Sequence, residues 1–330
     1  KGDATNLDGV DVARYKKLIE RFVKAGEPVQ MVFIGFPFKS HHNPLKTNRQ
    51  LPDLGEFYFL RRLLEIDATV KQVYAPGISW IILSEGEAYR EIGHISGQEV
   101  CEYLKGVRKF VSLLGAQDRI QFVSLAELFR RYPEFESRVG ETKEALEKQF
   151  QNSPESLSTD FQTMLWTMRH SADTRTFTSE ELYYLTYDTC PESAPEEIRS
   201  KWQQVYDEAV RMTCWYASIN QVKNVIGKDG GSIIQETYPH ACYVSITPKP
   251  GRYAFHALSS NSRFLPHHGV PILVGKRNGY VRVAYLVDIL SKPHQYRAVY
   301  VAEDSEGKPF FYHQIENNHK AQVTGAWGGY

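Results

Sequence analysis

The first 125 residues alternate between short apolar runs and longer stretches with helical spacing, and this alternation constrains the fold more than any other feature of the chain. The apolar runs at 29–35, 78–83 and 120–125 have the near-continuous hydrophobicity of strands that are buried on both faces. A strand–helix–strand–helix–strand order predicts a parallel sheet with right-handed crossovers. No Gly-x-Gly-x-x-Gly follows any of these runs, so we expect a Rossmann-like α/β core without the dinucleotide fingerprint.

The rest of the chain divides by its patterning into two further regions. Residues 1–125 form the Rossmann-like α/β half with its strand-end loops, residues 126–226 read as a helical insertion, and residues 227–330 are strand-rich and partly antiparallel. Within the last region, residues 280–287 (YVRVAYLV) read as one continuous strand, and Asn278-Gly279 is a hairpin signal. No clear linker separates the regions, which leaves open that the C-terminal strands extend the first sheet and complete its site.

A long polar loop follows the first predicted strand. Between Gly35 and the helix that begins near Glu56, the loop carries three Lys or Arg residues, two His residues and a carboxylate. Loops between a strand and a helix usually span about 2–6 residues, and longer ones are commonly functional. Ligands of open α/β sheets bind at the carboxyl ends of the strands, so this loop is the first candidate for a site. The alternative is a solvated insertion.

Composition narrows the class of protein. The 330 residues contain 39 Lys+Arg and 39 Asp+Glu, so the net charge is zero. The chain therefore lacks the excess of positive charge that is typical of proteins that bind nucleic acid or a membrane surface. The longest apolar runs fall far short of the roughly 20 residues of a transmembrane helix. The four cysteines are scattered without a Cys-x-x-Cys pair, which argues against a zinc site or a disulfide framework. We therefore expect four buried thiols in a protein of the reducing cytoplasm.

Five short segments resemble the isocyanide (isonitrile) synthases of the pyoverdine/dityrosine biosynthesis family. The segments at 35–40 (GFPFKS) and 52–56 (PDLGE) carry most of the resemblance, and those at 81–86 (IILSEG), 245–248 (SITP) and 265–270 (LPHHGV) follow in the family's order. Three positions differ from the family pattern: Glu85 stands where Asp is expected, Thr247 where His is expected, and His267 where Trp is expected. The change at Thr247 removes an imidazole, which argues against acid–base chemistry there.

Lys39 is the first candidate catalytic residue. A partly buried Lys at a strand end can bind phosphate as a point charge, act as a base or form a Schiff base, whereas the alternative is a surface Lys. Asp53 and Glu56 are candidates for capturing an ammonium or moving protons, and they equally fit a capping box at the start of the helix. Glu85 follows the second strand, so we expect Lys39, Asp53, Glu56 and Glu85 to converge at one edge of the sheet.

His residues and a basic cluster complete the candidate site. His268 is predicted to serve in acid–base catalysis or phosphate contact, because it occupies the position of the family's Pro-Trp-His motif. Ser40, His41, His267 and Arg175 are candidate substrate or phosphate ligands, although Arg175 also fits a charged helix end. We find no two-His-plus-carboxylate set at recognisable sequence spacing, so no metal site is predicted.

The resemblance implies a complete reaction. It implies that the α-amine of tyrosine or tryptophan becomes an isocyanide whose carbon comes from C2 of ribulose 5-phosphate, with no metal, nucleotide or flavin cofactor. An iron/2-oxoglutarate oxygenase is the implied pathway neighbour, with no nucleic-acid or membrane partner. The alternatives are another sugar-phosphate or amine-condensing enzyme on the same core, and an RNA binder of the KH type, because residues 227–230 fit a Gly-x-x-Gly loop.

Overall fold

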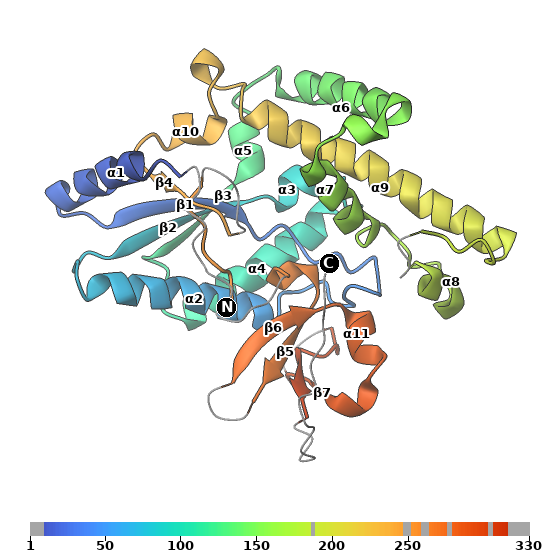
Figure 1. Cartoon of the computed structure of the whole chain (residues 1–330). Coiled ribbons are helices and arrows are strands. Elements are labelled where there is room, and N and C mark those ends of the chain that lie inside the picture. The colour runs from blue at the N-terminus through green and yellow to red at the C-terminus, as the bar shows by residue number, and fades with distance from the viewer. Residues whose placement is uncertain are drawn as a thin grey trace, which may run out of the picture.

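The core of the protein is a parallel sheet of four strands. The computed structural model describes residues 10–185, 189–246, 252–258, 264–275, 279–302 and 306–315 (Figure 1). The strands β1 (Val29–Gly35), β2 (Ile78–Ser84), β3 (Ile120–Ser124) and β4 (Cys242–Tyr243) lie in the order β3-β2-β1-β4, and every neighbouring pair is parallel. The predicted Rossmann-like core is confirmed, and β4 shows that the C-terminal region does extend this sheet.

Both faces of the sheet are covered by helices, as the near-continuous apolar strands require. Successive residues of β1 point to opposite faces, so Val32 belongs to one core cluster and Phe33 to the other. The helices α2 (Leu54–Lys71) and α4 (Gly97–Leu113) cover the Phe33 face, beneath the sheet in Figure 1. The short helices α3 (Gly86–Tyr89), α5 (Leu125–Phe129) and α10 (Ile233–Thr237) pack on the other face, and α1 (Val12–Ala25) packs against β1 and β4.

The predicted helical insertion forms a third layer above the Val32 face. It contains α6 (Phe135–Asn152), the short 3₁₀ turn η1 (Pro154–Ser156), α7 (Thr159–Arg169), α8 (Ser179–Tyr184) and the long α9 (Glu196–Lys223). Figure 1 shows α9 crossing the upper part of the molecule with α6 and α7 beside it. Buried residues of α9 such as Met212 and Ile219 join the same core cluster as Val32, so this layer packs over that face of the sheet.

A second, smaller sheet contains the remaining strands. Its strands β5 (Val270–Val274), β6 (Tyr280–Ala284), β7 (Tyr296–Val299) and β8 (Phe311–Gln314) lie in the order β6-β5-β8-β7. The β5–β6 and β7–β8 pairs are antiparallel and the β5–β8 pair is parallel, which confirms a partly antiparallel C-terminal region. These strands form a sheet of their own and do not extend the first one. Two further 3₁₀ turns, η3 (Pro266–His268) and η4 (Pro293–Gln295), precede β5 and β7.

The prediction of one strand over 280–287 is wrong in its second half. Strand β6 ends at Ala284, and α11 (Leu286–Leu290) begins two residues later. The backbone N–H groups of Leu286 and Val287 donate to the carbonyls of Lys46 and Leu45, at 3.1 and 3.0 Å. Because these donors are used by the loop after β1, the segment cannot continue the strand ladder. Two other predictions concern residues outside the described part of the chain. They are the hairpin turn that includes Asn278, and the loss of acid–base chemistry at Thr247.

The expectation of four buried thiols is also wrong in part. Cys214 and Cys242 are buried, whereas Cys190 is half-buried and Cys101 is exposed on α4. Cys101 lies on the outward face of an amphipathic helix, where the spacing of apolar residues does not require burial. Among the described residues, no helix combines the length and the apolar character needed to cross a bilayer.

Candidate active site

A cavity of about 270 Å³ opens at the carboxyl ends of β1, β2 and β4. Its walls are the loop after β1, the α3 segment, helices α7 and α9, the residues that continue β4, and the η3 turn. In the register of the sheet, Gly35 of β1 lies opposite Ser84 of β2, so the loops that follow the two strands start at the same level. The strand-end position expected from the sequence is therefore where the structure has its cavity.

The cavity is basic, with a single carboxylate among its described lining residues. Lys46, Lys223 and Arg252 contribute cations, and Glu85 contributes the carboxylate. The lining also has an apolar part, which includes Met164 of α7. A site with excess positive charge, one acidic group and an apolar wall suits a small ligand that carries anionic groups, an amine and a hydrophobic part.

Lys46 is the most informative residue of this cavity, and it was not among the predicted site residues. Its side chain is buried, and Nζ donates to Ser171 Oγ at 2.6 Å and to Ser40 Oγ at 3.3 Å. No carboxylate forms an ion pair with Lys46 in the described part of the chain, and burial lowers the pKa of its amine to about 7. A buried Lys with this pKa can change charge near neutral pH, which is typical of functional sites.

The η3 turn presents His267 and His268 to the cavity, as the sequence predicted for a pair beside the site. Burial lowers the pKa of both imidazoles well below the usual range, and the nearby Lys46 and Lys39 lower it further. Both rings are therefore neutral at pH 7, and each can donate one hydrogen bond and accept another. Their use in acid–base catalysis or phosphate contact stays a prediction.

Lys39, Asp53 and Glu56 converge as predicted, but they do not line the cavity. Lys39 Nζ lies 2.7 Å from Asp53 Oδ2 and 3.3 Å from Glu56 Oε1, and all three side chains are fully buried. The surface interpretation of Lys39 is therefore wrong. Burial raises the pKa of Asp53, which the adjacent Lys39 opposes and the adjacent Glu56 reinforces.

This buried triad supports the cavity from behind. Lys39 Nζ also donates to the backbone carbonyls of Pro266 and Gly269, at 3.2 and 3.4 Å, and these residues flank the two imidazoles. The capping-box interpretation of Asp53 and Glu56 is confirmed, because Asp53 Oδ1 accepts from Gly55 N and Glu56 Oε2 accepts from Asp53 N, both at 2.9 Å. The triad thus fixes the start of α2 and the η3 turn together, while direct contact with a substrate stays a prediction.

The other predicted residues lie in different places. Ser40 and Glu85 line the cavity, whereas Lys39, Asp53 and Glu56 lie behind it. His41 lies beside Glu99 at the start of α4, outside the cavity lining. Arg175 is exposed and forms a bidentate pair with Asp173, so its predicted phosphate contact would require that pair to open.

Several lining residues were not among the predicted site residues. Tyr89, Tyr216 and Tyr243 approach the cavity from α3, α9 and β4, and burial raises the pKa of each phenol, so each hydroxyl keeps its proton near pH 7. Lys223 and Arg252 come from the end of α9 and from the segment after β4. These residues are far apart in the sequence, and only the closure of the helical layer over the sheet brings them together.

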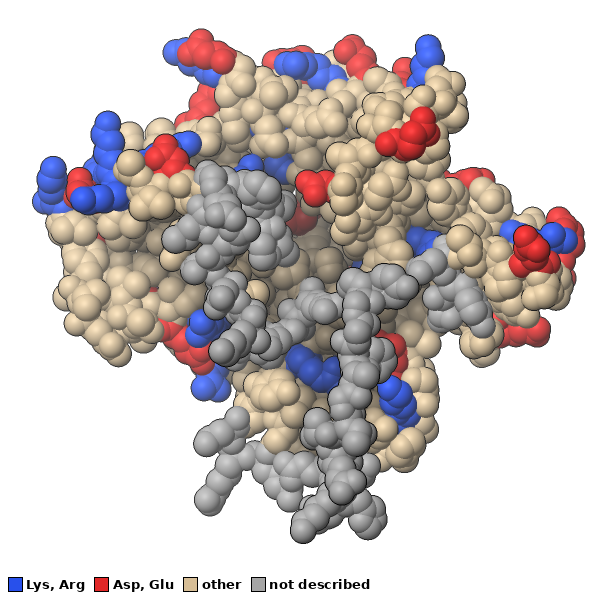
Figure 2. All heavy atoms as spheres, in the orientation of Figure 1, with Lys and Arg blue, Asp and Glu red and all other residues tan. Residues whose placement is uncertain are grey.

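The Gly227–Gly231 segment does not resemble an open phosphate clamp. It lies between α9 and α10 and contains the short turn η2 (Lys228–Gly230), and α9 already ends at Lys223, with Asn224 as its C-cap. The backbone N–H of Lys228 donates to the Glu236 carboxylate at 2.6 Å, and Gly227 N donates to Gly231 O. In Figure 2, on the face that is visible, Lys and Arg side chains alternate with Asp and Glu and form no extended basic patch.

The fold and the cavity together define the class: an α/β protein with a basic, partly apolar cavity at the carboxyl ends of parallel strands. The family described as "Pyoverdine/dityrosine biosynthesis protein" matches residues 19–282, so the chain belongs to this family. The resemblance noted in the sequence is confirmed.

Individual relatives have low sequence identity but extend over most of the chain. The chain is 22% identical over 280 residues to "L-tryptophan isonitrile synthase AmbI1" of Fischerella ambigua, covering 82% of this chain and 78% of that protein. It is 23% identical over 294 residues to the "L-tyrosine isonitrile synthase" of Pseudomonas aeruginosa, covering 84% of this chain and 82% of that protein. The crystal structure of the PvcA protein from Pseudomonas aeruginosa superposes with a TM-score of 0.62 at 20% identity, covering 91% of this chain and 90% of that one, which shows the shared fold.

Proposed function

We propose that the chain is an isocyanide synthase that converts the α-amine of an aromatic amino acid into an isocyanide, with C2 of ribulose 5-phosphate as the carbon source. The observation that carries the proposal is the charge distribution of the cavity, which has an excess of cations, one carboxylate and neutral imidazoles among its described lining residues. Membership of the family and the printed activities of the two relatives support it.

The cavity offers partners for three groups of the two substrates. The Glu85 carboxylate suits the amino acid's ammonium, and the apolar wall that includes Met164 suits its aromatic ring. Lys46, with Ser40 and Ser171 on either side, suits the phosphate, because a compact ammonium and two hydroxyls can all donate to phosphate oxygens. Binding of a phosphate would raise the pKa of Lys46 above 7 and keep the side chain charged.

The chemistry needs proton transfers more than any other catalytic device. Condensation of the amine with the C2 ketone forms an imine and releases water, and each step moves protons on and off nitrogen. His268 and His267 are neutral at pH 7 and lie at the cavity wall, so either ring can hydrogen-bond to the reacting nitrogen and pass a proton on without retaining it. The Lys39 triad positions the turn that carries both rings.

The proposal extends to the setting of the reaction. We place the enzyme in the cytoplasm and expect an iron/2-oxoglutarate oxygenase to consume its product. We also expect turnover without any added metal, nucleotide or flavin, since imine chemistry of this kind requires none.

The direct test is incubation of the purified chain with ribulose 5-phosphate and either tyrosine or tryptophan. We expect a new product with the infrared stretch of an isocyanide, from one of the two amino acids, in the presence of a chelator. A product that contains the condensed amine but no isocyanide would favour the other sugar-phosphate and amine-condensing enzymes. Consumption of neither substrate would contradict the proposal.

A further inference from the structure

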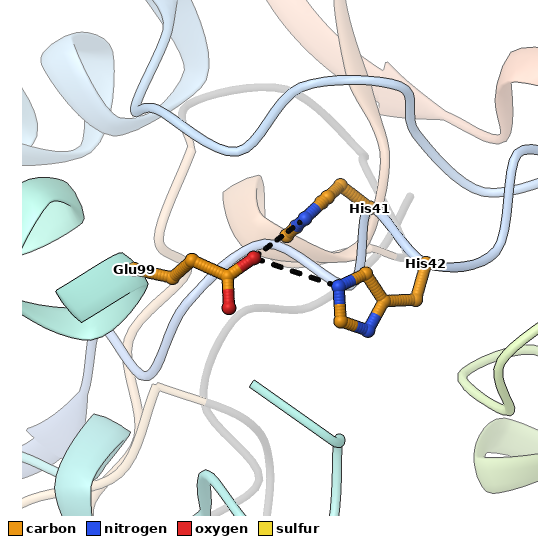
Figure 3. A group of neighbouring side chains, drawn as sticks. All are labelled: His41, His42 and Glu99. Atoms are coloured by element: carbon orange, nitrogen blue, oxygen red, sulfur yellow. Dashed lines mark ion pairs between the residues drawn. The ribbon is translucent and has the colours of Figure 1, made fainter. Parts of the chain in front are cut away.

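Two imidazoles and a carboxylate meet at the loop after β1, although their spacing in the sequence matches no recognisable metal motif. His41 and His42 belong to that loop, and Glu99 belongs to the first turn of α4 (Figure 3). Glu99 Oε1 lies 3.0 Å from His41 Nε2 and 3.5 Å from His42 Nε2. None of the three residues lines the cavity, so this cluster is separate from the proposed active site.

The hydrogen bond on the far side of His41 leaves Nε2 as the ring nitrogen that faces Glu99. His41 Nδ1 lies 3.2 Å from the carbonyl oxygen of Lys39, which can only accept, so Nδ1 carries the hydrogen. In the neutral ring, Nε2 then presents a lone pair to a carboxylate oxygen that also has only lone pairs. A proton on Nε2 resolves this conflict, and so does a metal cation bound between the two atoms. A ligand His that donates its other N–H to a backbone carbonyl is also the usual support of a metal site.

His42 gives a second, independent indication. Its side chain is only 3% exposed, and neither ring nitrogen has a hydrogen-bond partner among the described residues. A buried polar group without a partner is costly and uncommon in folded proteins. The backbone carbonyl of His42 accepts from Thr174 N at 3.0 Å, so the loop is held in the position that directs this ring toward Glu99.

Glu99 divides its two oxygens between two tasks. Oε2 accepts from the backbone N–H of Ser96 at 2.7 Å, which completes the capping box of α4. Oε1 is the oxygen that faces both imidazoles. Two other charged residues near His42, Arg175 and Asp173, form an ion pair with each other. Their opposite charges largely cancel, so Arg175 does not strongly repel a cation bound at this cluster.

We propose that His41, His42 and Glu99 bind one divalent first-row transition-metal ion, with Zn²⁺ as the reference ion. Zn²⁺ bonds of about 2.0–2.2 Å in tetrahedral geometry hold neighbouring ligand atoms about 3.3–3.5 Å apart, close to the two separations from Glu99 Oε1. His41 and Glu99 are 18% and 21% exposed, which leaves the solvent side for a water ligand. The ion ties the loop that carries Ser40 and Lys46 to the start of α4, and the inference does not depend on the proposed reaction.

The test is Zn²⁺ binding to the tag-free apoprotein, measured by calorimetry and by metal content after dialysis. We expect one Zn²⁺ per chain and a higher melting temperature, because an ion that binds only the folded state stabilises it. His41→Ala and Glu99→Gln should each weaken binding by at least about 100-fold, since even supporting residues around a metal contribute roughly 10–100-fold. These two residues are partly exposed, so their variants should fold, and circular dichroism checks this.

His94→Ala is the matched control. His94 Nε2 also lies against a carboxylate, Glu208 Oε1, at 2.6 Å, but this surface pair lacks a second imidazole. Binding should be unchanged in this variant. Absence of stoichiometric Zn²⁺ in the wild-type protein would overturn the proposal. So would binding that survives both His41→Ala and Glu99→Gln, or that is lost in His94→Ala alone.

Discussion

Lys39 and Lys46 lie in the same loop and are both fully buried, yet their surroundings differ in the one respect that matters for function. Lys39 is held by Asp53 and Glu56, behind the cavity wall. Lys46 contacts two hydroxyls, has no carboxylate partner in the described structure, and lines the cavity. Burial alone therefore does not separate a supporting Lys from a ligand-binding one, whereas the neighbouring charges do.

The largest effect on stability should come from replacing Lys39, the Lys that is paired with two carboxylates. Lys39→Met leaves two buried carboxylates without their cation, and such losses cost about 3–5 kcal/mol in the free energy of unfolding. Chemical denaturation measures this change. The sequence alone leads one to expect that a loop Lys is dispensable for folding, and the buried triad reverses that expectation.

A compensating variant sharpens this prediction. Lys39→Met combined with Asp53→Asn and Glu56→Gln removes the uncompensated charges and should recover part of the lost stability. If Lys39→Met alone unfolds at the wild-type denaturant concentration, the triad does not support the fold.

Replacing Lys46, which has no carboxylate partner among the described residues, should affect turnover far more than stability. Lys46→Met should lower turnover by about 100- to 1,000-fold, the range found when one preorganised donor is removed from an active site. It should cost little stability, because the amine has no carboxylate to leave unpaired among the described residues. Steady-state kinetics and denaturation on the same preparation measure both quantities, with the exposed Lys228→Met as control.

The pH dependence of stability separates the two lysines further. The folded-state pKa of Lys46 is lowered from 10.5 to about 7, so between these values the native state binds fewer protons than the unfolded state. Stability contributed by this group is therefore present above about pH 10 and is lost as the pH falls toward 7. The difference in unfolding free energy between wild type and Lys46→Met should rise from pH 7 to pH 10. A difference that is constant over this window would mean that Lys46 is ordinarily charged.

The smallest effect is expected far from the strand ends. Asp229 lies in the η2 turn, outside the cavity lining, so Asp229→Lys should leave turnover unchanged. Neither the wild type nor this variant should bind single-stranded RNA at physiological salt. Salt-sensitive binding that is lost in Gly230→Asp would instead support a Gly-x-x-Gly clamp.

The sequence predicted the parts of the fold that depend on local pattern. The apolar runs gave β1, β2 and β3 nearly to the residue, and Asp53 with Glu56 gave the capping box of α2. The end of β6 was missed, because its cause is a pair of hydrogen bonds to the distant Lys46 and Leu45 carbonyls. Local propensity carries no information about such a contact.

The candidate site was predicted in position but not in its inner arrangement. Strand ends identify the edge of the sheet, and they correctly bring Lys39 close to Asp53 and Glu56. Which Lys faces the cavity depends on how the loop folds back, and the Glu99 partner of His41 and His42 comes from a different helix. Lys46 was counted among the cations of the loop, but nothing in the sequence indicated that it, rather than Lys39, would face the cavity.

The central claim is that the cavity beside Lys46 is the place where an isocyanide is made. The most direct measurement is product formation from ribulose 5-phosphate labelled with ¹³C at C2, together with tyrosine or tryptophan, by the wild type, Lys46→Met and Lys228→Met. The account predicts a ¹³C-labelled isocyanide from the wild type and Lys228→Met, and almost none from a folded Lys46→Met. Undiminished isocyanide from Lys46→Met, or an isocyanide carbon without the label, would contradict it.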